Sequence, residues 1–271
     1  MIRLIGTDLD GTLLDDKKMI TLKNRLAIRK AVLKGVKVVI TTGRPMCDTM
    51  INYYKDLNLY QKNEYMIGFN GAVIYDIYTQ EVIYENTITG KDVKKLKEFA
   101  KKFEGVYTHI YKENTVYYED INKYTLYEQE VNKVEMKQIN YDEFANEDKI
   151  IKFMIVGDEE KLDKVVEHLD SNIKNEYTIL RSMPFYLEFV NKDVNKYVGL
   201  KELARRLKIE DDEIMAIGDN LNDYHMVKHA FMGIAMKNAV EEVKEIARYI
   251  TKSNNESGVA YAIDTLILDE N

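Results

Sequence analysis

Several common features of proteins are scarce or missing in this chain of 271 residues. It has a single cysteine, Cys47, which excludes an internal disulfide and fits the reducing cytosol. No stretch approaches the roughly 20 consecutive apolar residues that a membrane-spanning helix needs. The first residues, Met1–Ile5, lead straight into a strand-like pattern without the basic and long apolar regions of a signal peptide. We therefore expect a cytoplasmic protein with no membrane partner.

Positively charged residues are fewer than negatively charged ones. The chain has 39 Lys and Arg against 46 Asp and Glu, a formal net charge of −7, so we expect no nucleic-acid partner. The glycine-rich loops that bind nucleoside triphosphates or dinucleotides are absent as well. If such an acidic protein binds a phosphate, its positive potential must come locally from a metal ion and a few cationic side chains. Carboxylates that can hold a metal are therefore the features to look for.

Both ends of the chain alternate strand-like and helix-like patterns. The first forty residues predict a strand, an acidic loop, a helix over 21–34 with Thr21 as N-cap, and a strand over 36–40. The apolar face expected for this helix consists of Leu22, Leu26, Ile28, Val32 and Leu33. The nearly continuous apolar run at 36–40 is typical of a strand buried on both faces in a parallel sheet. The last eighty residues repeat this pattern, with strands predicted at 214–217, 232–235 and 249–250.

The middle of the chain has a different pattern, in which strands alternate apolar and polar residues as in an antiparallel sheet with one wet face. It predicts a Lys-rich helix at 91–102 with a solvated lysine face, a hairpin at 106–118, and helices over 123–138 and 160–173. We predict an α/β fold: a doubly wound, Rossmann-like parallel-sheet core formed by residues 1–84 and 191–271. An α+β domain, residues 85–190, is inserted into it.

The first strand is followed directly by Asp8-Leu9-Asp10-Gly11-Thr12. Two carboxylates one residue apart at a strand end can converge on a hard cation. One of them can attack phosphorus beside a metal, while the other protonates the leaving oxygen and then activates water. Two acids that merely cap a turn are the simpler interpretation of this segment alone. An EF-hand is excluded, because its sixth and twelfth positions hold Leu13 and Met19 instead of Gly and Glu.

Three further segments favour the chemical interpretation. Thr42 and the amide of Gly43 follow the second strand and can donate hydrogen bonds to a phosphoryl group. Lys196 begins a predicted helix, where a lone lysine is usually solvated. Gly218-Asp219-Asn220-Leu221-Asn222-Asp223 follows another buried strand. Asp219 at that strand's tip can join Asp8 and Asp10, and Asn222 and Asp223 fall on the next turn.

In this order, Asp-Leu-Asp-Gly-Thr, Thr-Gly-Arg, Lys and Gly-Asp-Asn-Leu-Asn-Asp resemble the four motifs of the haloacid dehalogenase-like hydrolase superfamily. The resemblance covers the whole chain. It is strongest to the Cof-type sugar-phosphatase branch, whose large α+β cap of the C2B type is inserted between the second and third motifs. Phe69-Asn70-Gly71-Ala72 resembles the Asn-Gly-Ala element of that branch.

This resemblance implies roles for particular residues. Asp8 would be the nucleophile and a metal ligand. Asp10 would be the acid/base, with its main-chain carbonyl on Mg²⁺. Asp219 would hold the metal and Asp223 would be a weaker ligand or support. The residues implied to bind the phosphoryl group are Leu9 through its amide, Thr42, Gly43, Lys196 and Asn222.

Arg44 and Asn70 are candidates for substrate contacts. Tyr197 follows the motif lysine where the family usually has a small residue, but the Val194-Asn195 lead-in favours Lys196 over Lys192 and Lys201.

The resemblance implies a Mg²⁺-dependent phosphatase that acts on a small-molecule phosphate ester through an aspartyl-phosphate, with the cap closing over the substrate. A phosphomutase of the same superfamily and a non-catalytic sensor of phosphorylated metabolites are the alternatives. The sequence specifies neither the substrate nor an oligomeric state.

Overall fold

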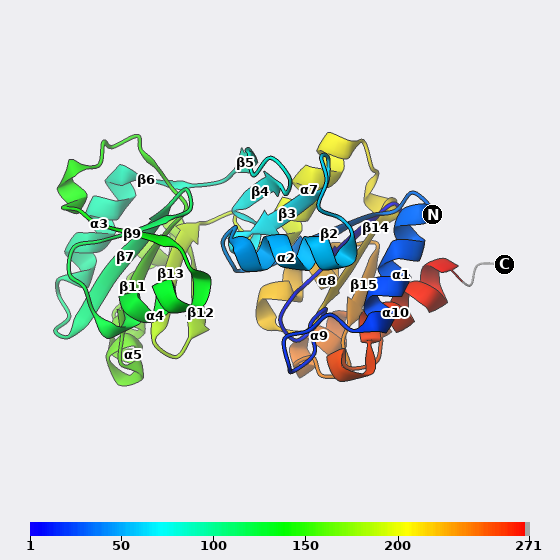
Figure 1. Cartoon of the computed structure of the whole chain (residues 1–271). Helices are drawn as coiled ribbons and strands as arrows, with labels where there is room; N and C mark the ends of the chain where they lie inside the picture. Colours follow the sequence, from blue (N-terminus) through cyan, green and yellow to red (C-terminus); the bar gives the residue numbers. More distant parts are fainter. Residues whose placement is uncertain (269–271) are drawn as a thin grey trace. The chain divides into compact units, whose positions relative to one another are not determined.

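The computed structural model describes residues 1–268 (Figure 1). The contacts divide the chain into two compact units. The core unit consists of Met1–Tyr84 and the described residues from Asn195 on, and the insert unit is Glu85–Val194. No helix within residues 1–268 is long and apolar enough to span a membrane.

The core unit is built on an eight-stranded sheet of order β16-β15-β14-β1-β2-β3-β4-β5. Its strands are β1 (Leu4–Thr7), β2 (Lys37–Thr41), β3 (Tyr65–Gly68), β4 (Val73–Asp76), β5 (Val82–Glu85), β14 (Ile214–Gly218), β15 (Met232–Ala235) and β16 (Tyr249–Ile250). Every pair from β16 to β3 is parallel, and β4 pairs antiparallel with β3. Because β1 lies between β14 and β2, the residues that leave these three strands meet at one edge of the sheet.

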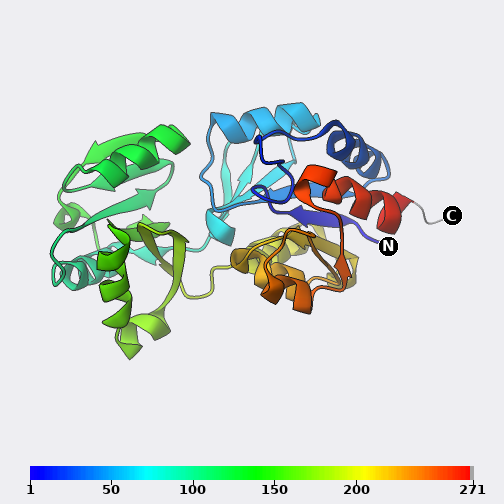
Figure 2. The same cartoon turned by 90° about the horizontal axis from the view of Figure 1, so that it is seen from below.

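Helices cover both faces of this sheet (Figure 2). They are α1 (Leu22–Leu33), α2 (Asp48–Leu57), α7 (Lys196–Leu207), α8 (Tyr224–His229), α9 (Glu241–Ile246) and α10 (Gly258–Ile263), which runs on into a π-helical turn, Asp264–Leu268. Helices α1, α2 and α10 lie on one face, and α7, α8 and α9 lie on the other. The predicted doubly wound α/β fold is therefore confirmed.

Helix α1 begins and ends as predicted, but the predicted apolar face was right only at Ile28, which is buried. Leu22, Leu26 and Leu33 are exposed. The buried side chains are Asn24, Ala27, Ile28 and Ala31. Small alanines let α1 approach α10 closely, and the Asn24 amide satisfies backbone groups by donating to the Leu13 carbonyl (3.1 Å) and accepting from the Ala260 amide (2.9 Å).

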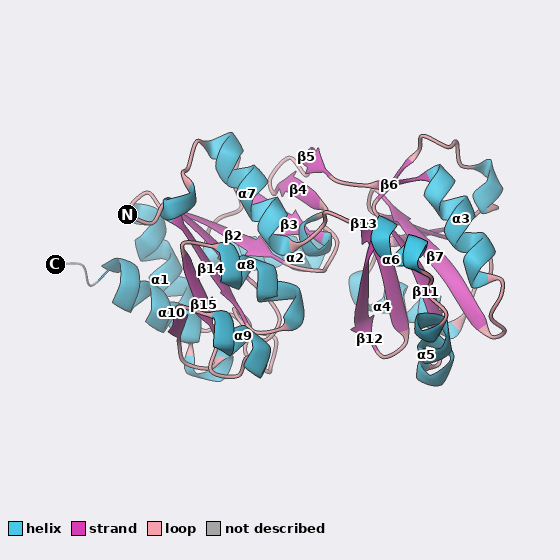
Figure 3. Cartoon of the chain, turned by 180° about the vertical axis from the view of Figure 1, so that it is seen from behind, coloured by secondary structure: helices cyan, strands magenta, loops and turns pink. Residues whose placement is uncertain are grey.

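The insert unit has a six-stranded sheet of order β12-β13-β11-β7-β8-β9 and a small two-stranded sheet, β10-β6. The strands are β6 (Ile88–Thr89), β7 (Val106–Lys112), β8 (Thr115–Tyr118), β9 (Glu135–Gln138), β10 (Lys149–Ile150), β11 (Lys152–Gly157), β12 (Tyr177–Met183) and β13 (Tyr186–Asn191). The helices are α3 (Gly90–Ala100), α4 (Lys123–Asn132), α5 (Glu159–Glu167) and α6 (Ser171–Glu176). Helices α3 and α6 lie on one face of the larger sheet and α4 on the other (Figure 3). This separate mixed sheet with its helices is the predicted α+β insertion.

Two predicted helices of the insert were too long. The helix expected over 123–138 ends at Asn132, Lys133 takes a left-handed conformation (φ 54°), and the chain continues as β9, which pairs in parallel with β8. The helix expected over 160–173 is broken into α5 and α6. Asp170 caps the second piece by accepting a hydrogen bond from the Ile173 amide (2.8 Å).

The lysine face predicted for α3 was wrong at one position. Lys97 is buried and forms ion pairs with Glu119 (2.8 Å) and Asp142 (3.1 Å). A lysine on the rim of an apolar stripe can bury its methylene stem while its ammonium group reaches a carboxylate.

The face of the large sheet that α4 covers is polar and buried. Lys152 on β11 pairs with Glu188 on β13 at 3.0 Å, and Tyr111 on β7 donates a short hydrogen bond to Glu128 of α4. His109 is completely buried beside Met154, and its Nδ1 has no hydrogen-bond partner within residues 1–268.

Candidate active site

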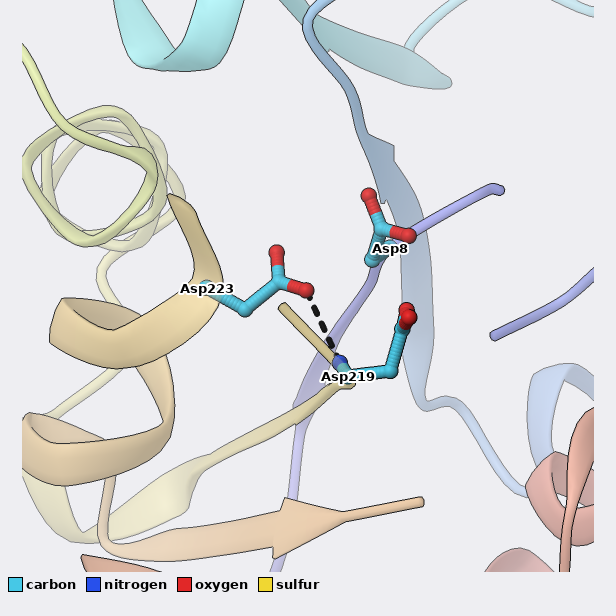
Figure 4. Close-up of side chains that lie close together, drawn as sticks. All are labelled: Asp8, Asp219 and Asp223. Carbon is cyan, nitrogen blue, oxygen red and sulfur yellow. Dashed lines mark hydrogen bonds between the residues drawn. The ribbon is translucent and has the colours of Figure 1, made fainter. Parts of the chain in front are cut away.

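Asp8 and Asp219 are brought together by neighbouring strands of the core sheet. Asp8 is the first residue after β1, and its amide continues the ladder by donating to the Ile217 carbonyl of β14 (2.9 Å). Asp219 is the first residue after β14. Because parallel neighbours end at the same edge, the two carboxylates lie side by side, with Asp223 opposite them (Figure 4).

These three side chains, Asp8, Asp219 and Asp223, form a cluster suited to a divalent metal. Each offers a carboxylate oxygen, and these oxygens all lie within 4.8 Å of one another. Burial, together with the charge of Asp223, raises the pKa of Asp8 well above its usual value and that of Asp219 to about 6. Three partly desolvated acids this close need positive charge, and hard cations prefer oxygen ligands of this kind.

Asp223 is a rigid part of the cluster. One of its oxygens, Oδ2, accepts hydrogen bonds from the amides of Asp219 (2.9 Å) and Asn220 (3.1 Å), and Oδ1 accepts from Lys196 (2.6 Å). A side chain at Gly218 would put its Cβ 2.4 Å from the Asp223 Cβ, so the turn closes this tightly only with glycine.

Lys196 is the cation of the site. It is the first residue of α7, is fully buried, and forms ion pairs with both Asp8 and Asp223. Burial alone would lower its pKa, but the two carboxylates outweigh that effect and raise it. Lys201 lies elsewhere on α7 and pairs with Asp211 (2.9 Å), so the structure brings Lys196 to Asp8 as predicted.

A strained turn supports Lys196 and Asn222. Phe69, Asn70 and Gly71 have successive φ values of 51°, 56° and 101°, a costly conformation for the first two. Gly71 packs directly on the chain that enters α7, where an added Cβ would lie 2.1 Å from the Asn195 carbonyl oxygen. The side-chain Oδ1 of Asn70 accepts a hydrogen bond from Asn222 Nδ2 (3.0 Å). Asn70, predicted to contact substrate, thus ties two motifs together.

The phosphate-binding candidates Thr42 and Gly43 follow β2 at the same sheet edge. The Thr42 hydroxyl is buried and accepts from the Arg44 amide (3.2 Å), which leaves its proton for another acceptor. Gly43 lies against the Asn70 side-chain amide, 3.2 Å from where its Cβ would be. Leu9 is fully buried, and its carbonyl accepts from Leu14 (2.9 Å), which fixes the acidic loop.

The Asp10 side chain is not part of the three-carboxylate cluster, so the expectation that Asp219 joins both Asp8 and Asp10 was wrong for Asp10. Arg44 binds it with two hydrogen bonds, of 2.8 Å to Oδ2 and 2.7 Å to Oδ1, and Lys18 adds a third to Oδ1 (2.7 Å). Burial opposes ionisation of Asp10, but the hydrogen bonds from Arg44 and Lys18 prevail and lower its pKa. Arg44, predicted to contact substrate, is therefore bound to Asp10 here.

Two residues of this site carried no predicted role. Thr12 donates a hydrogen bond to Asp219 Oδ1 (2.7 Å), and its place in the acidic motif was a signal for it. Lys18 lies in a turn with a left-handed backbone (φ 61°), and its local sequence gives no sign that its ammonium group reaches Asp10.

Comparison with known proteins shows the family to which the chain belongs. Residues 5–263 match the family of haloacid dehalogenase-like hydrolases. A putative phosphatase of Bacillus subtilis is 36% identical over 270 residues, 99% of each chain. A 5-amino-6-(5-phospho-D-ribitylamino)uracil phosphatase of the same organism is 34% identical, over 98% of this chain and 96% of the relative.

Solved structures extend the likeness to the fold. A haloacid dehalogenase-like hydrolase from Bacteroides thetaiotaomicron superposes with a TM-score of 0.84 at 31% identity, over 98% of this chain and all of the other. A sugar phosphatase of subclass IIB superposes with a TM-score of 0.78 at 27% identity, over 97% of this chain and 98% of the other. The chain therefore belongs to the haloacid dehalogenase-like hydrolases, in the Cof-type subclass IIB with a C2B cap, and is a phosphatase of that family.

Proposed function

We propose that this protein is a Mg²⁺-dependent phosphatase that removes the phosphoryl group of a small phosphorylated metabolite through an aspartyl-phosphate on Asp8. The observation that carries the proposal is the position of Asp8. Its carboxylate lies at the end of the central strand, paired with the buried Lys196 and next to Asp219 and Asp223. This environment can hold a carboxylate in one orientation and offset negative charge that gathers around it.

The reaction would proceed in two steps. First, a carboxylate oxygen of Asp8 attacks phosphorus, the bond from phosphorus to the ester oxygen breaks, and Asp10 gives a proton to the leaving oxygen. Then water attacks the phosphorus of the aspartyl-phosphate while Asp10 takes a proton from it, so that inorganic phosphate leaves and Asp8 is regenerated.

Five residues around Asp8 would hold the phosphoryl group during both steps. The donors are the Leu9 and Gly43 amides, the Thr42 hydroxyl, the Asn222 amide and the Lys196 ammonium group. In support of this role, Thr42 and Lys196 are buried and Asn222 is fixed by Asn70. Preorganised donors stabilise the charge that develops on phosphoryl oxygens without having to reorient.

The acidic cluster fits Mg²⁺, which takes carboxylate and carbonyl oxygens. Asp8, Asp219 and the main-chain carbonyl of Asp10 would hold the ion, with Asp223 as a support or weaker ligand. Bound there, the metal would neutralise charge on the phosphoryl oxygens. The raised pKa values of Asp8 and Asp219 support this assignment, because burial and the nearby charge of Asp223 disfavour their ionised forms, which a bound cation would stabilise.

The relatives support a proposal for the substrate class. One is a phosphatase of a ribitylamino-uracil phosphate and another is a sugar phosphatase, so we propose a small phosphate ester such as a sugar phosphate. We further propose that the insert, residues 85–190, is the domain that determines which ester is accepted.

The test is release of inorganic phosphate from a panel of phosphorylated metabolites, with Mg²⁺ and again with excess chelator. We expect stoichiometric phosphate release from at least one sugar phosphate, abolished by the chelator. Isomerised sugar phosphate without phosphate release would indicate a phosphomutase. Thermal stabilisation by Mg²⁺ and phosphate analogues without turnover would indicate a sensor. Either result would refute the proposal.

A further inference from the structure

We propose that Arg44, assisted by Lys18, is a positioning residue that orients the Asp10 carboxylate and leaves only its Oδ2 oxygen free for proton exchange with the substrate. This inference rests on the proposed function, in which Asp10 is the acid/base. It assigns to Arg44 a role in the chemical step, distinct from the substrate contact that its motif predicts.

The geometry fixes the plane of the carboxylate. Arg44 Nε donates to Asp10 Oδ2 (2.8 Å) and Nη2 donates to Oδ1 (2.7 Å), so the planar guanidinium engages both oxygens at once. Such paired bonds set direction as well as strength, which a single ammonium group does not. Arg44 and Asp10 side chains are 25% and 36% exposed, so water competes for this contact only in part.

Lys18 makes the two oxygens unequal. Its ammonium group donates to Oδ1 (2.7 Å), which then accepts two hydrogen bonds, while Oδ2 accepts only the one from Arg44 within the described residues. A carboxylate oxygen has two lone pairs. Oδ1 is therefore saturated, and Oδ2 keeps one lone pair that can carry a proton to the leaving oxygen or take one from water.

Several hydrogen bonds fix the turn that presents Lys18. Asp15 Oδ1 accepts from the amides of Lys17 and Met19 (2.9 Å each), and the Asp15 carbonyl accepts from the Lys18 amide (2.9 Å). Lys18 itself is left-handed (φ 61°), a conformation that costs a non-glycine residue free energy and recurs at functional sites. Tyr53 of α2 also donates to the Lys18 carbonyl (3.4 Å).

The backbone of Arg44 links the contacts around Asp10 to the residues proposed to bind the phosphoryl group. Its amide donates to the Thr42 hydroxyl (3.2 Å), and its carbonyl accepts from the amide of Phe69 (3.3 Å), at the start of the strained turn that supports Asn222. Asp10 is thus held by a residue whose backbone is bound by Thr42, which is proposed to hold the phosphoryl group, and by Phe69 of the strained turn.

The experiment compares two substrates in Arg44→Lys. An alkyl phosphate needs a proton on its leaving oxygen, whereas p-nitrophenyl phosphate has a stable leaving anion and needs little help. The ratio kcat/KM reports the first step, so a misplaced acid should lower it by on the order of 100-fold for the alkyl ester and only a few-fold for the aryl ester. Lys18→Met should also lower kcat/KM more for the alkyl ester than for the aryl ester, but both losses should be smaller than in Arg44→Lys.

The matched control is Arg25→Lys. Arg25 pairs with Asp56 at 2.5 Å in the same unit, at similar side-chain exposure (32% and 34%), away from Asp10. We expect it to leave kcat/KM unchanged for both esters. Both substitutions retain the positive charge, so we expect the two variants to have equal melting temperatures. This measurement checks that both variants fold.

Two results would overturn the inference. An equal loss of kcat/KM for both esters would make Arg44 a scaffold or phosphate ligand, and a rise in KM at unchanged kcat would make it an ordinary substrate contact. Failure of the proposed function is distinguishable, because the wild-type protein itself would then release no phosphate from either ester.

Discussion

His109 in the insert unit should make the stability of this unit depend on pH. The side chain is completely buried on β7, against Met154 and Tyr186, and near the Lys152–Glu188 ion pair. Burial, reinforced by the positive charge of Lys152, lowers its pKa from 6.5 to about 3. The folded unit therefore keeps His109 neutral at pH values where the unfolded chain protonates it.

The sign and size of the effect follow from this difference. The stabilisation is complete above pH 6.5 and is lost as the pH falls toward 3, because only the unfolded state binds the proton in that interval. At about pH 5, roughly 1.5 pH units below the unfolded pKa, the loss is about 2 kcal/mol at 1.36 kcal/mol per unit.

The perturbation is His109→Leu, which removes the titrating ring and leaves an apolar side chain beside Met154 and Tyr186. Hydrogen exchange of the β7 and β11 amides, measured at about pH 7.5 and about pH 5, gives the free energy of opening within the insert unit. The drop between the two pH values should be about 2 kcal/mol smaller in the variant than in the wild type. The exposed His168, changed to Leu, is the matched control and should keep the wild-type drop. An unchanged drop in His109→Leu would refute the reasoning.

Two further predictions concern the site. Lys196→Met leaves Asp8 and Asp223 buried without their cation, so we expect loss of turnover and a destabilisation of about 3–5 kcal/mol. Added Mg²⁺ should restore part of the melting temperature, and a variant as stable as the wild type without metal would contradict this. Asp219→Asn keeps an acceptor for Thr12 but removes a charge, so the Mg²⁺ concentration for half-maximal phosphate release should rise by on the order of tenfold or more. An unchanged Mg²⁺ requirement would remove Asp219 from the metal site.

The sequence predicts much of the fold because buried parallel strands are continuous apolar runs. Val38, Val39 and Ile40 mark β2, and Ile214–Ile217 mark β14, so the residues that follow them are placed at one sheet edge by topology alone. Asp8 and Asp219 meet in the structure for that reason, whereas Lys196 reaches Asp8 from the first residue of α7. Their catalytic and metal-binding roles stay predictions until the variants are measured.

Tertiary contacts decide what the sequence does not predict. The pattern at 123–138 favours one helix, but β8 offers an unpaired edge that residues 135–138 occupy as β9. In α1, the wider leucine face is exposed because α10 requires the small face around Asn24. Likewise, that Arg44 points at Asp10 depends on a partner 34 positions away in the chain, which no local pattern encodes.

The central claim is that Asp8 receives the phosphoryl group, and a quenched single-turnover reaction tests it most directly. Wild-type protein is mixed with a phosphate ester and Mg²⁺, quenched in acid, and digested for peptide mass spectrometry. We predict one added phosphoryl group on Asp8 of the peptide that carries residues 8–12, and neither this adduct nor phosphate release in Asp8→Asn. A phosphoryl group on another residue, or turnover near the wild-type rate in Asp8→Asn, would contradict the account.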